Sequence, residues 1–271
     1  MNISVISPVH GQTGNTTVAL MLAHALALTQ RKNICLTHLN FNDPSLASAL
    51  GEENTGDAST SLTHIVKMLK NDSLNFEELP NYAIKVFPGL DLYTSNQVTI
   101  EQQELLSFYE SLLTNMTAYN HVVVDIDSGI YSSLSKSILG ISDVVIIPVT
   151  HNTYIFDKAK KLKDEILNSI SRVRRRREIK IYYLLNHYNP KISSYRQVAR
   201  QLGVKPSKLL TLHSNFGFVQ VCNSGKTSDA FAASLRGKTQ FADIRSDLKL
   251  ACKVILRKEF IWELKKGGET L

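Results

Sequence analysis

The sequence predicts an α/β fold, a doubly wound and mostly parallel sheet with helices on both faces. Short strand-like runs alternate with longer helical patterns along the chain, which is typical of this class. Several runs, such as 121–125 and 144–149, are apolar throughout, as expected of strands covered on both faces. The chain has 271 residues and 43% hydrophobic content, enough for one substantial core. We therefore expect a single domain over 1–271, with about 241–271 forming a C-terminal amphipathic helix and tail.

Each element is predicted from its periodicity. Strands are expected at 3–7, 34–39, 84–87, 91–94, 121–126, 143–149, 180–185 and 208–212. Helical periodicity is clearest at 16–30, 100–116, 154–171 and 241–265. The Gly-, Asn- and Ser-rich segment 51–61 is predicted to be a surface loop. In a doubly wound sheet ligands bind at the carboxyl ends of the strands, so a site is expected in the loops there.

The cysteines and the apolar runs indicate the compartment. Cys35, Cys222 and Cys252 have no C-x-x-C spacing, which argues against a disulfide framework or a zinc site. The opening residues have neither the basic region nor the long apolar stretch of a secretory signal. The apolar runs are far shorter than the ~20 residues of a membrane-spanning helix. We expect a soluble, cytoplasmic protein.

The loop after the first strand carries the strongest functional signal. Gly11 and Gly14 lie between that strand and a helix that opens at Thr16, where backbone N–H groups and a helix N-terminus can hold phosphate. A standard Walker A loop would have glycine and lysine where this chain has Val9 and Asn15. The alternative is a glycine turn that only caps a helix.

The run from His10 to Thr17 resembles the deviant Walker A loop of the MinD/ParA superfamily, which reads lysine-glycine-glycine-x-glycine-lysine-threonine-threonine. His10 and Asn15 stand where that family has its two lysines. The resemblance implies binding of ATP and Mg²⁺, with Thr16 as a magnesium ligand. The nucleotide-binding residues that it implies are His10, Gly11, Gln12, Thr13, Gly14, Asn15, Thr16 and Thr17.

Later segments resemble further landmarks of the same family. Residues 119–129 are similar to its Walker B and switch II run, which implies Asp125 as the catalytic residue and a metal ligand, and Gly129 near the γ-phosphate. The alternative is that Asp125 only ends a strand. Asn186 matches an asparagine that contacts adenine, although an asparagine that caps a strand end is commoner.

The switch I segment departs from the family pattern. His38 and Asn40 stand where the family has two aspartates, one of which normally orients the attacking water or the magnesium shell. Asp43 is nearby, but Asp-Pro is equally a common turn dipeptide. The absence of the loop lysines and of these carboxylates together predicts impaired hydrolysis.

The resemblance extends from about residue 3 to residue 250, with the landmarks in the order of the family. Within the superfamily, the absence of the loop lysine makes the chain most similar to the TadZ/CpaE branch, which helps to localise pilus machinery. The resemblance implies a homodimer and a partner protein of partition, pilus or conjugation machinery.

The formal net charge of +7 and a pI near 9.2 favour the binding of polyanions. Because ParA-like proteins bind DNA nonspecifically, the basic run is a candidate DNA contact, and the alternative is a solvated helix end. Its residues are Arg174, Arg175, Arg176 and Arg177.

The C-terminal segment allows two interpretations. MinD-like proteins end in a basic amphipathic helix that binds membrane, and 248–266 has a suitable composition. Packing of the last helix on the sheet explains most of the same residues, so we favour packing over a membrane contact.

The leading hypothesis is a MinD/ParA-like ATP-binding protein for partition or subcellular positioning, with weak or absent hydrolysis. One alternative is a pseudo-ATPase that binds no nucleotide and serves as an interaction module of pilus, conjugation or plasmid machinery. Another is a slow partition-type ATPase that uses Asp125. The sequence leaves open whether the chain is an enzyme.

Overall fold

A computed structural model of the chain describes residues 1–30, 33–39, 45–51, 61–71, 73–94, 101–114, 118–171, 179–235 and 241–256. The described strands form one eight-stranded sheet in the order β3-β4-β2-β5-β1-β6-β7-β8. Its strands are β1 (Asn2–Ile6), β2 (Ile34–His38), β3 (Ile84–Phe87), β4 (Leu90–Tyr93), β5 (His121–Ile126), β6 (Val144–Val149), β7 (Lys180–Tyr188) and β8 (Leu209–His213). All neighbouring pairs are parallel except the antiparallel β3 and β4, which confirms the predicted fold class.

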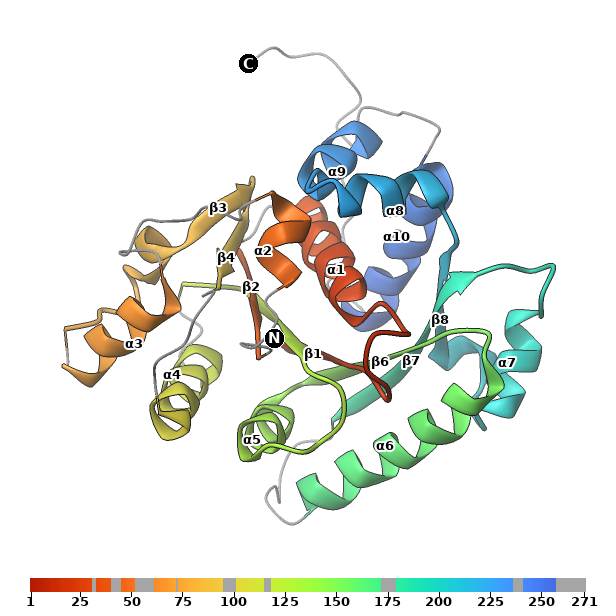
Figure 1. Cartoon of the computed structure of the whole chain (residues 1–271), viewed down its shortest axis with the longest axis horizontal. Helices are drawn as coiled ribbons and strands as arrows, with labels where there is room; N and C mark the ends of the chain where they lie inside the picture. The colour runs from red at the N-terminus through yellow and green to blue at the C-terminus, as the bar shows by residue number, and fades with distance from the viewer. Residues whose placement is uncertain are drawn as a thin grey trace.

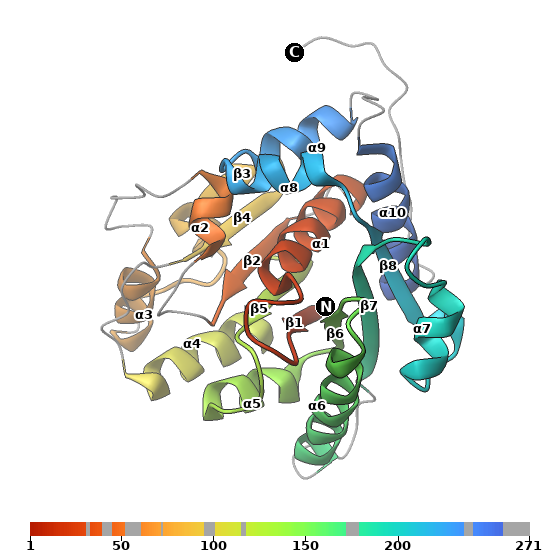
Figure 2. The same ribbon diagram turned by 45° about the vertical axis from the view of Figure 1, so that its right-hand side comes forward.

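Helices cover both faces of the sheet (Figures 1 and 2). The hydrophobic core on one face includes residues of α1 (Asn15–Gln30), α2 (Ser45–Leu50), α8 (Phe216–Asn223), α9 (Thr227–Leu235) and α10 (Ala242–Leu256). The core on the other face includes residues of α3 (Leu62–Lys70), α4 (Gln102–Thr114), α5 (Ser133–Ile141), α6 (Thr153–Ser171) and α7 (Tyr195–Gln201). The 3₁₀ turns η2 (Leu79–Tyr82) and η3 (Pro206–Lys208) lie in connections. The result is a helix–sheet–helix sandwich.

Helix α1 is apolar on all sides, and its residues from Val18 to Ala27 are all buried. A helix without a polar face has to be enclosed, and α1 packs on β1, β2 and β5 with α2 and α10 beside it. Its first turn is thereby fixed at the carboxyl ends of β1 and β5. The functional site is at this point.

The predicted strands are confirmed, with boundaries close to those expected, except that β7 continues to Tyr188. The first three predicted helices are α1, α4 and α6. The predicted terminal helix is confirmed as α10, and 257–271 lie outside the described residues, as do 52–60 of the predicted loop. The periodicity missed the shorter helices α2, α3, α5, α7, α8 and α9. The starts of α3 and α5 are capped by Ser61 and Ser132.

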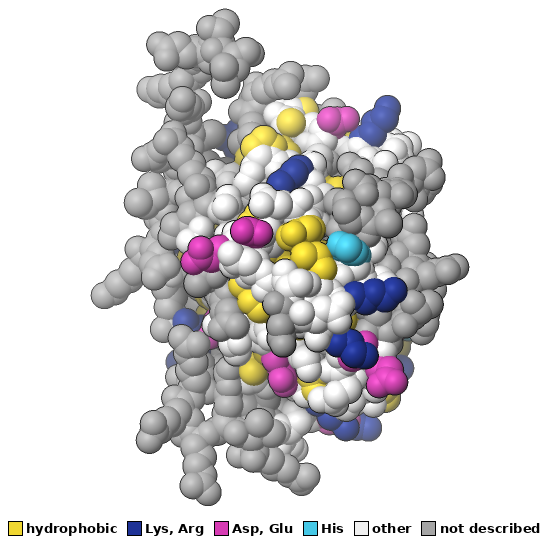
Figure 3. All heavy atoms as spheres, turned by 90° about the vertical axis from the view of Figure 1, so that its left-hand side faces the viewer, with side chains coloured by type: hydrophobic (Ala, Val, Ile, Leu, Met, Phe, Trp, Pro, Cys, Tyr) yellow, Lys and Arg dark blue, Asp and Glu magenta, His cyan; other side chains and the backbone are white. Residues whose placement is uncertain are grey.

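The side of the molecule that carries α3 and β3 mixes hydrophobic, basic and acidic side chains (Figure 3). Lys70 and Glu104 form an ion pair at 2.5 Å, and Lys85 and Asp91 form another at 2.7 Å. Within the described ranges, no helix has both the length and the apolar character needed to cross a bilayer.

Candidate functional site

The loop between β1 and α1 is held in shape by its own side chains. Gly11 and Gly14 both have a φ of 70°, in the left-handed region that favours glycine. The hydroxyl groups of Ser7 and Thr13 are buried and lie 2.7 Å apart, and the Ser7 hydroxyl also donates a hydrogen bond to the carbonyl of Val9. These contacts involve protein groups only, so the loop has its shape before any ligand binds.

A cavity of about 220 Å³ opens over this loop at the carboxyl ends of β1 and β5. It brings together the predicted loop residues, except Gln12, with Asp125. The lining residues are Ser7, Val9, His10, Gly11, Thr13, Gly14, Asn15, Thr16, Thr17, Asp125, Ile126, Asp127 and Ser128.

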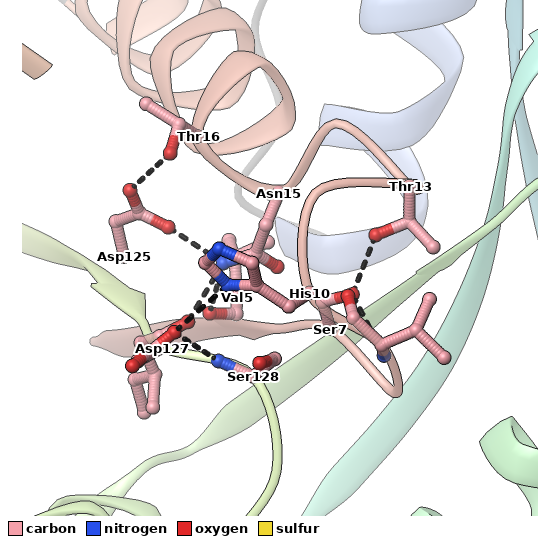
Figure 4. A network of polar contacts seen from close by, with 11 residues as sticks. Val5, Ser7, His10, Thr13, Asn15, Thr16, Asp125, Asp127 and Ser128 are labelled. Carbon is pink, nitrogen blue, oxygen red and sulfur yellow. Dashed lines mark hydrogen bonds and ion pairs between the residues drawn. The ribbon is translucent and has the colours of Figure 1, made fainter. Parts of the chain in front are cut away.

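Asn15 points inward from the first residue of α1, toward the ends of both strands (Figure 4). Its Nδ2 donates to Oδ1 of Asp125 at 2.6 Å, and it is 2.8 Å from the carbonyl oxygen of Ile126 and 3.2 Å from that of Val5. Three acceptors around one nitrogen fix the orientation of the amide. Its Oδ1 is buried and has no hydrogen-bond partner among the residues that the structure describes. The residue at the lysine position thus ties α1 to the sheet.

Asp125 is fully enclosed by these contacts. Its second oxygen accepts a hydrogen bond from the Thr16 hydroxyl at 2.7 Å. Burial raises the pKa of Asp125 to about 7, the hydrogen bonds from Thr16 and Asn15 oppose this rise, and the charge of Asp127 adds to it. The carboxylate therefore lacks a compensating cation.

Among the described residues that line the cavity there is no lysine or arginine. The candidate cation among them is His10, whose side chain is 77% exposed and whose Nδ1 lies 3.8 Å from Oδ1 of Asp127 (Figure 4). Two carboxylates and no fixed positive charge make the lining unfavourable for a bare polyanion. Only the backbone N–H groups and the positive end of α1 favour an anion here.

Gly129 and Asn186 lie behind the loop. The N–H of Gly129 donates to the carbonyl oxygen of Ser7 at 3.1 Å. The Nδ2 of Asn186 donates to the carbonyl oxygen of Thr13 at 2.9 Å, and its Oδ1 accepts from the N–H of His187 at 3.0 Å. Both predicted residues therefore support the loop, and neither lines the cavity.

Other predicted residues do not meet at the cavity. His38 is buried, and its Nε2 lies 2.8 Å from the hydroxyl oxygen of Thr94. Gln12 is exposed and does not line the cavity. Asn40, Asp43 and the arginines 174–177 lie outside the described residues.

Several residues of this region were not among the predicted site residues. Ser7 and Asp127 line the cavity, as do Val9, Ile126 and Ser128, and His187 lies beside Gly14. Asp127 occupies an unspecified position of the D-x-x-x-G pattern, and Ser7 precedes the glycines. His187 carries no local signal, because its place depends on the packing of β7 against the loop.

The oxygen atoms at the site suit magnesium. Thr16 and Asp125 present a hydroxyl and a carboxylate, which are oxygen ligands that Mg²⁺ prefers, and this ion usually keeps several of its waters. No cluster of three or more His, Cys, Asp or Glu side chains suited to a metal occurs in the described part of the chain. The residues present thus fit a magnesium ion that arrives with a phosphate ligand.

A second cavity, of about 740 Å³, adjoins the first and shares Thr16 and Thr17 with it. The ends of α2 and α8 form its far wall, where a Cβ on Gly51 would lie 2.8 Å from the carbonyl oxygen of Gly225. None of the described side chains that line it is charged. The lining residues are Thr16, Thr17, Leu20, Ser48, Ala49, Gly51, Cys222, Asn223, Ser224 and Gly225.

Comparison with known proteins identifies the fold. No protein-family model matches the sequence, and no curated protein matches it. A ParA family ATPase from Chlorobium tepidum TLS has a similar structure, with a TM-score of 0.68, 20% identity and coverage of 91% of this chain and 97% of that one.

Two further solved structures are similar over 95% of this chain and 98% of their own. They are the septum site-determining protein MinD from Pyrococcus horikoshii OT3, complexed with Mg-ADP (TM-score 0.67, 14% identity), and a putative plasmid partition protein from Borrelia burgdorferi B31, bound to AMPPNP (0.66, 19%). This chain has the fold of the ParA and MinD ATPases.

Proposed function

We propose that the chain is a MinD/ParA-like ATP-binding protein for partition or subcellular positioning, with weak or absent hydrolysis. The observation that carries this proposal is the preformed loop at the carboxyl ends of β1 and β5, whose described lining has no lysine or arginine. The similar MinD and Borrelia structures hold Mg-ADP and AMPPNP. A nucleotide in the same place is the ligand that the loop suits best.

Magnesium would supply the positive charge that the loop lacks. Thr16 and Asp125 would hold it through their oxygens, and backbone N–H groups of the loop would bind the phosphates. The buried Oδ1 of Asn15 has no hydrogen-bond partner, so it offers an acceptor to a metal-bound water. This chain should therefore bind the magnesium complex of ATP rather than free ATP.

Hydrolysis should be weak because the fixed charges that stabilise phosphoryl transfer are missing. The side chain of Asn15 carries no charge and is directed onto Asp125, Val5 and Ile126. The N–H of Gly129 donates to Ser7. The chain thus keeps the geometry that binds a nucleotide and loses the electrostatics that accelerate its cleavage.

The second cavity offers room for part of the nucleoside. It starts at Thr16 and Thr17, where the loop cavity ends, and its uncharged hydroxyl, amide and small apolar groups suit a sugar or a base. The stretch from Asn223 to Gly225 also lines it.

A homodimer joined across the mouth of the site is part of the proposal. Tyr131 is 89% exposed beside Gly129, and Phe216 is 74% exposed at the start of α8. Exposed aromatic residues are typical of protein interfaces. A partner protein of partition, pilus or conjugation machinery and nonspecific DNA remain predictions.

A second candidate function is an interaction module that binds no nucleotide. It is favoured by the absence of lysine and arginine from the cavity lining and by the protein donors on both oxygens of Asp125. Under this alternative the loop has a structural role only, and a partner protein binds the surface around the cavity.

Equilibrium binding of Mg·ATP to the purified chain, with turnover measured on the same sample, distinguishes these functions. The proposal expects saturable binding and slow or undetectable release of phosphate. No binding at millimolar Mg·ATP would favour the interaction module. Turnover that disappears in Asp125→Ala would instead indicate a slow ATPase, whereas turnover that survives this change would indicate a contaminant.

A further inference from the structure

His187 has an unusual backbone conformation. Its φ is 54°, and it is the only residue other than glycine with a positive φ among those that the structure describes. Residues with a side chain adopt this region rarely, and they cluster where the surrounding structure holds them for a function. Here the N–H of His187 donates to Oδ1 of Asn186 at 3.0 Å, and the same asparagine binds the loop at Thr13.

The imidazole of His187 lies against the phosphate loop. Its Nε2 would be 3.9 Å from a Cβ placed on Gly14, the residue before α1. The residue is exposed, and within the described structure its ring has no hydrogen-bond partner. By contrast, His24, His151 and His213 all use ring nitrogens in hydrogen bonds.

Asn186 leaves little capacity for a ligand. Its Oδ1 and one of its two N–H groups are already bonded within the protein, and the side chain is only 3% exposed. The amide is therefore a brace for the loop. The side chain at this strand end that a ligand can reach is that of the next residue, His187.

The chemistry of this imidazole suits an uncharged group. Partial burial of the ring lowers the pKa of His187 below its ordinary value, which disfavours the charged imidazole. A neutral imidazole offers one donor, one acceptor and an aromatic face, which suit a base or a sugar hydroxyl better than a phosphate.

We infer that His187 contacts the nucleoside part of the ligand whose phosphates occupy the loop. This inference rests on the proposed function. It makes His187 a specificity-determining residue that discriminates a nucleotide from a bare polyphosphate.

The test compares ADP with inorganic tripolyphosphate, each with Mg²⁺, by calorimetry on the wild type and on His187→Asn and His187→Ala. Asparagine tolerates a positive φ, so His187→Asn should keep the loop intact. We expect both variants to weaken ADP binding roughly fivefold to tenfold, as for one lost hydrogen bond or stacking contact, and to leave tripolyphosphate binding unchanged. His64→Asn, on α3, is the matched control and should change neither.

The outcomes separate the inference from the proposed function. If the wild type binds both ligands and ADP affinity is unchanged in both variants, the inference is wrong and the proposed function stands. An equal loss for both ligands would also overturn it, because His187 would then only support the loop. A wild type that binds neither ligand overturns both. As a second measurement on the wild type, the imidazole ¹H resonances of His187 should shift with ADP and not with tripolyphosphate.

Discussion

The amide nitrogen of Asn15 lies 2.6 Å from Oδ1 of Asp125 and donates a hydrogen bond to it. This bond joins the first residue of α1 to the end of β5. The MinD/ParA superfamily, which this loop resembles, has a lysine in place of Asn15. An amide can satisfy the buried carboxylate but cannot neutralise it, and this difference sets the expected behaviour of the site.

Asn15→Ala should destabilise the fold. The change removes the donor to Asp125 and to the carbonyl oxygens of Val5 and Ile126, and it leaves buried acceptors unsatisfied. We expect the free energy of unfolding in urea to fall by roughly 2 kcal/mol. The control Asn81→Ala, at an exposed position, should change it by less than about 0.5 kcal/mol. Equal effects of the two changes would show that the Asn15 contacts contribute no net stability.

Asn15→Lys should make ATP binding less dependent on metal. The ammonium group can donate to the same strand-end oxygens and also adds the positive charge that the lining lacks. We expect ATP affinity measured in EDTA to increase by at least about tenfold. Gln12→Lys adds the same charge outside the lining and should have little effect. A similar gain in both variants would point to the overall charge rather than to the position.

The two loop glycines should respond differently to alanine. Both have a φ of 70°, so both variants carry backbone strain of ~1 kcal/mol. A Cβ on Gly14 would lie 2.5 Å from Nδ2 of Asn186, whereas a Cβ on Gly11 would meet nothing within 4 Å. In denaturant unfolding, Gly14→Ala should therefore cost roughly 1–2 kcal/mol more than Gly11→Ala. Equal costs would contradict the close approach of Asn186 to the loop.

His24 on α1 should contribute a loss of stability in acid. Burial lowers the pKa of His24 from 6.5 to about 4, and its hydrogen bond to Leu20 only partly opposes this. Between these values the unfolded chain binds a proton at this position that the folded chain does not. The contribution of His24, fully present above pH 6.5, is therefore lost as the pH falls toward 4, by about 1.4 kcal/mol per pH unit and roughly 3 kcal/mol in all. Asp125, whose pKa is raised to about 7, contributes with the opposite sign, so the His24 contribution is measured as the difference between the wild type and a variant without this histidine.

The measurement is urea unfolding at several pH values between 7 and 4. His24→Phe keeps a ring beside Phe231, on which His24 is stacked at 4.5 Å. Between pH 7 and 4 this variant should lose roughly 3 kcal/mol less stability than the wild type. His64→Phe, at a partly exposed position on α3, should retain the wild-type dependence on pH. The same dependence on pH in His24→Phe and in the wild type would contradict the lowered pKa of His24.

Much of the fold follows from the sequence because the strands are buried on both faces. Runs such as 121–126 and 144–149 are apolar at nearly every position, so they could be located without tertiary information. The short helices α3 and α5 were missed. Each has nine residues, and their starts depend on the caps at Ser61 and Ser132 rather than on a long periodic pattern.

The site was predicted in part. The loop glycines, Thr16 and Asp125 meet at one cavity. They could be predicted because the family pattern specifies these residue types. Gly129 and Asn186 were expected to offer their N–H groups to a ligand. In the structure the backbone N–H of Gly129 is bonded to Ser7, and the side-chain amide of Asn186 is bonded to Thr13. Such pairings join segments far apart in the chain, and a pattern of residue types carries no information about them.

The most direct test of the central claim is calorimetric titration of ATP into the wild-type chain, once with Mg²⁺ and once with EDTA. The described lining of the cavity has two carboxylates and no lysine or arginine, so we expect the metal to supply the positive charge. We predict saturable binding with Mg²⁺ and an affinity at least about tenfold weaker in EDTA. Equal affinity in the two buffers, or no binding in either, would contradict a nucleotide site that depends on magnesium for its charge.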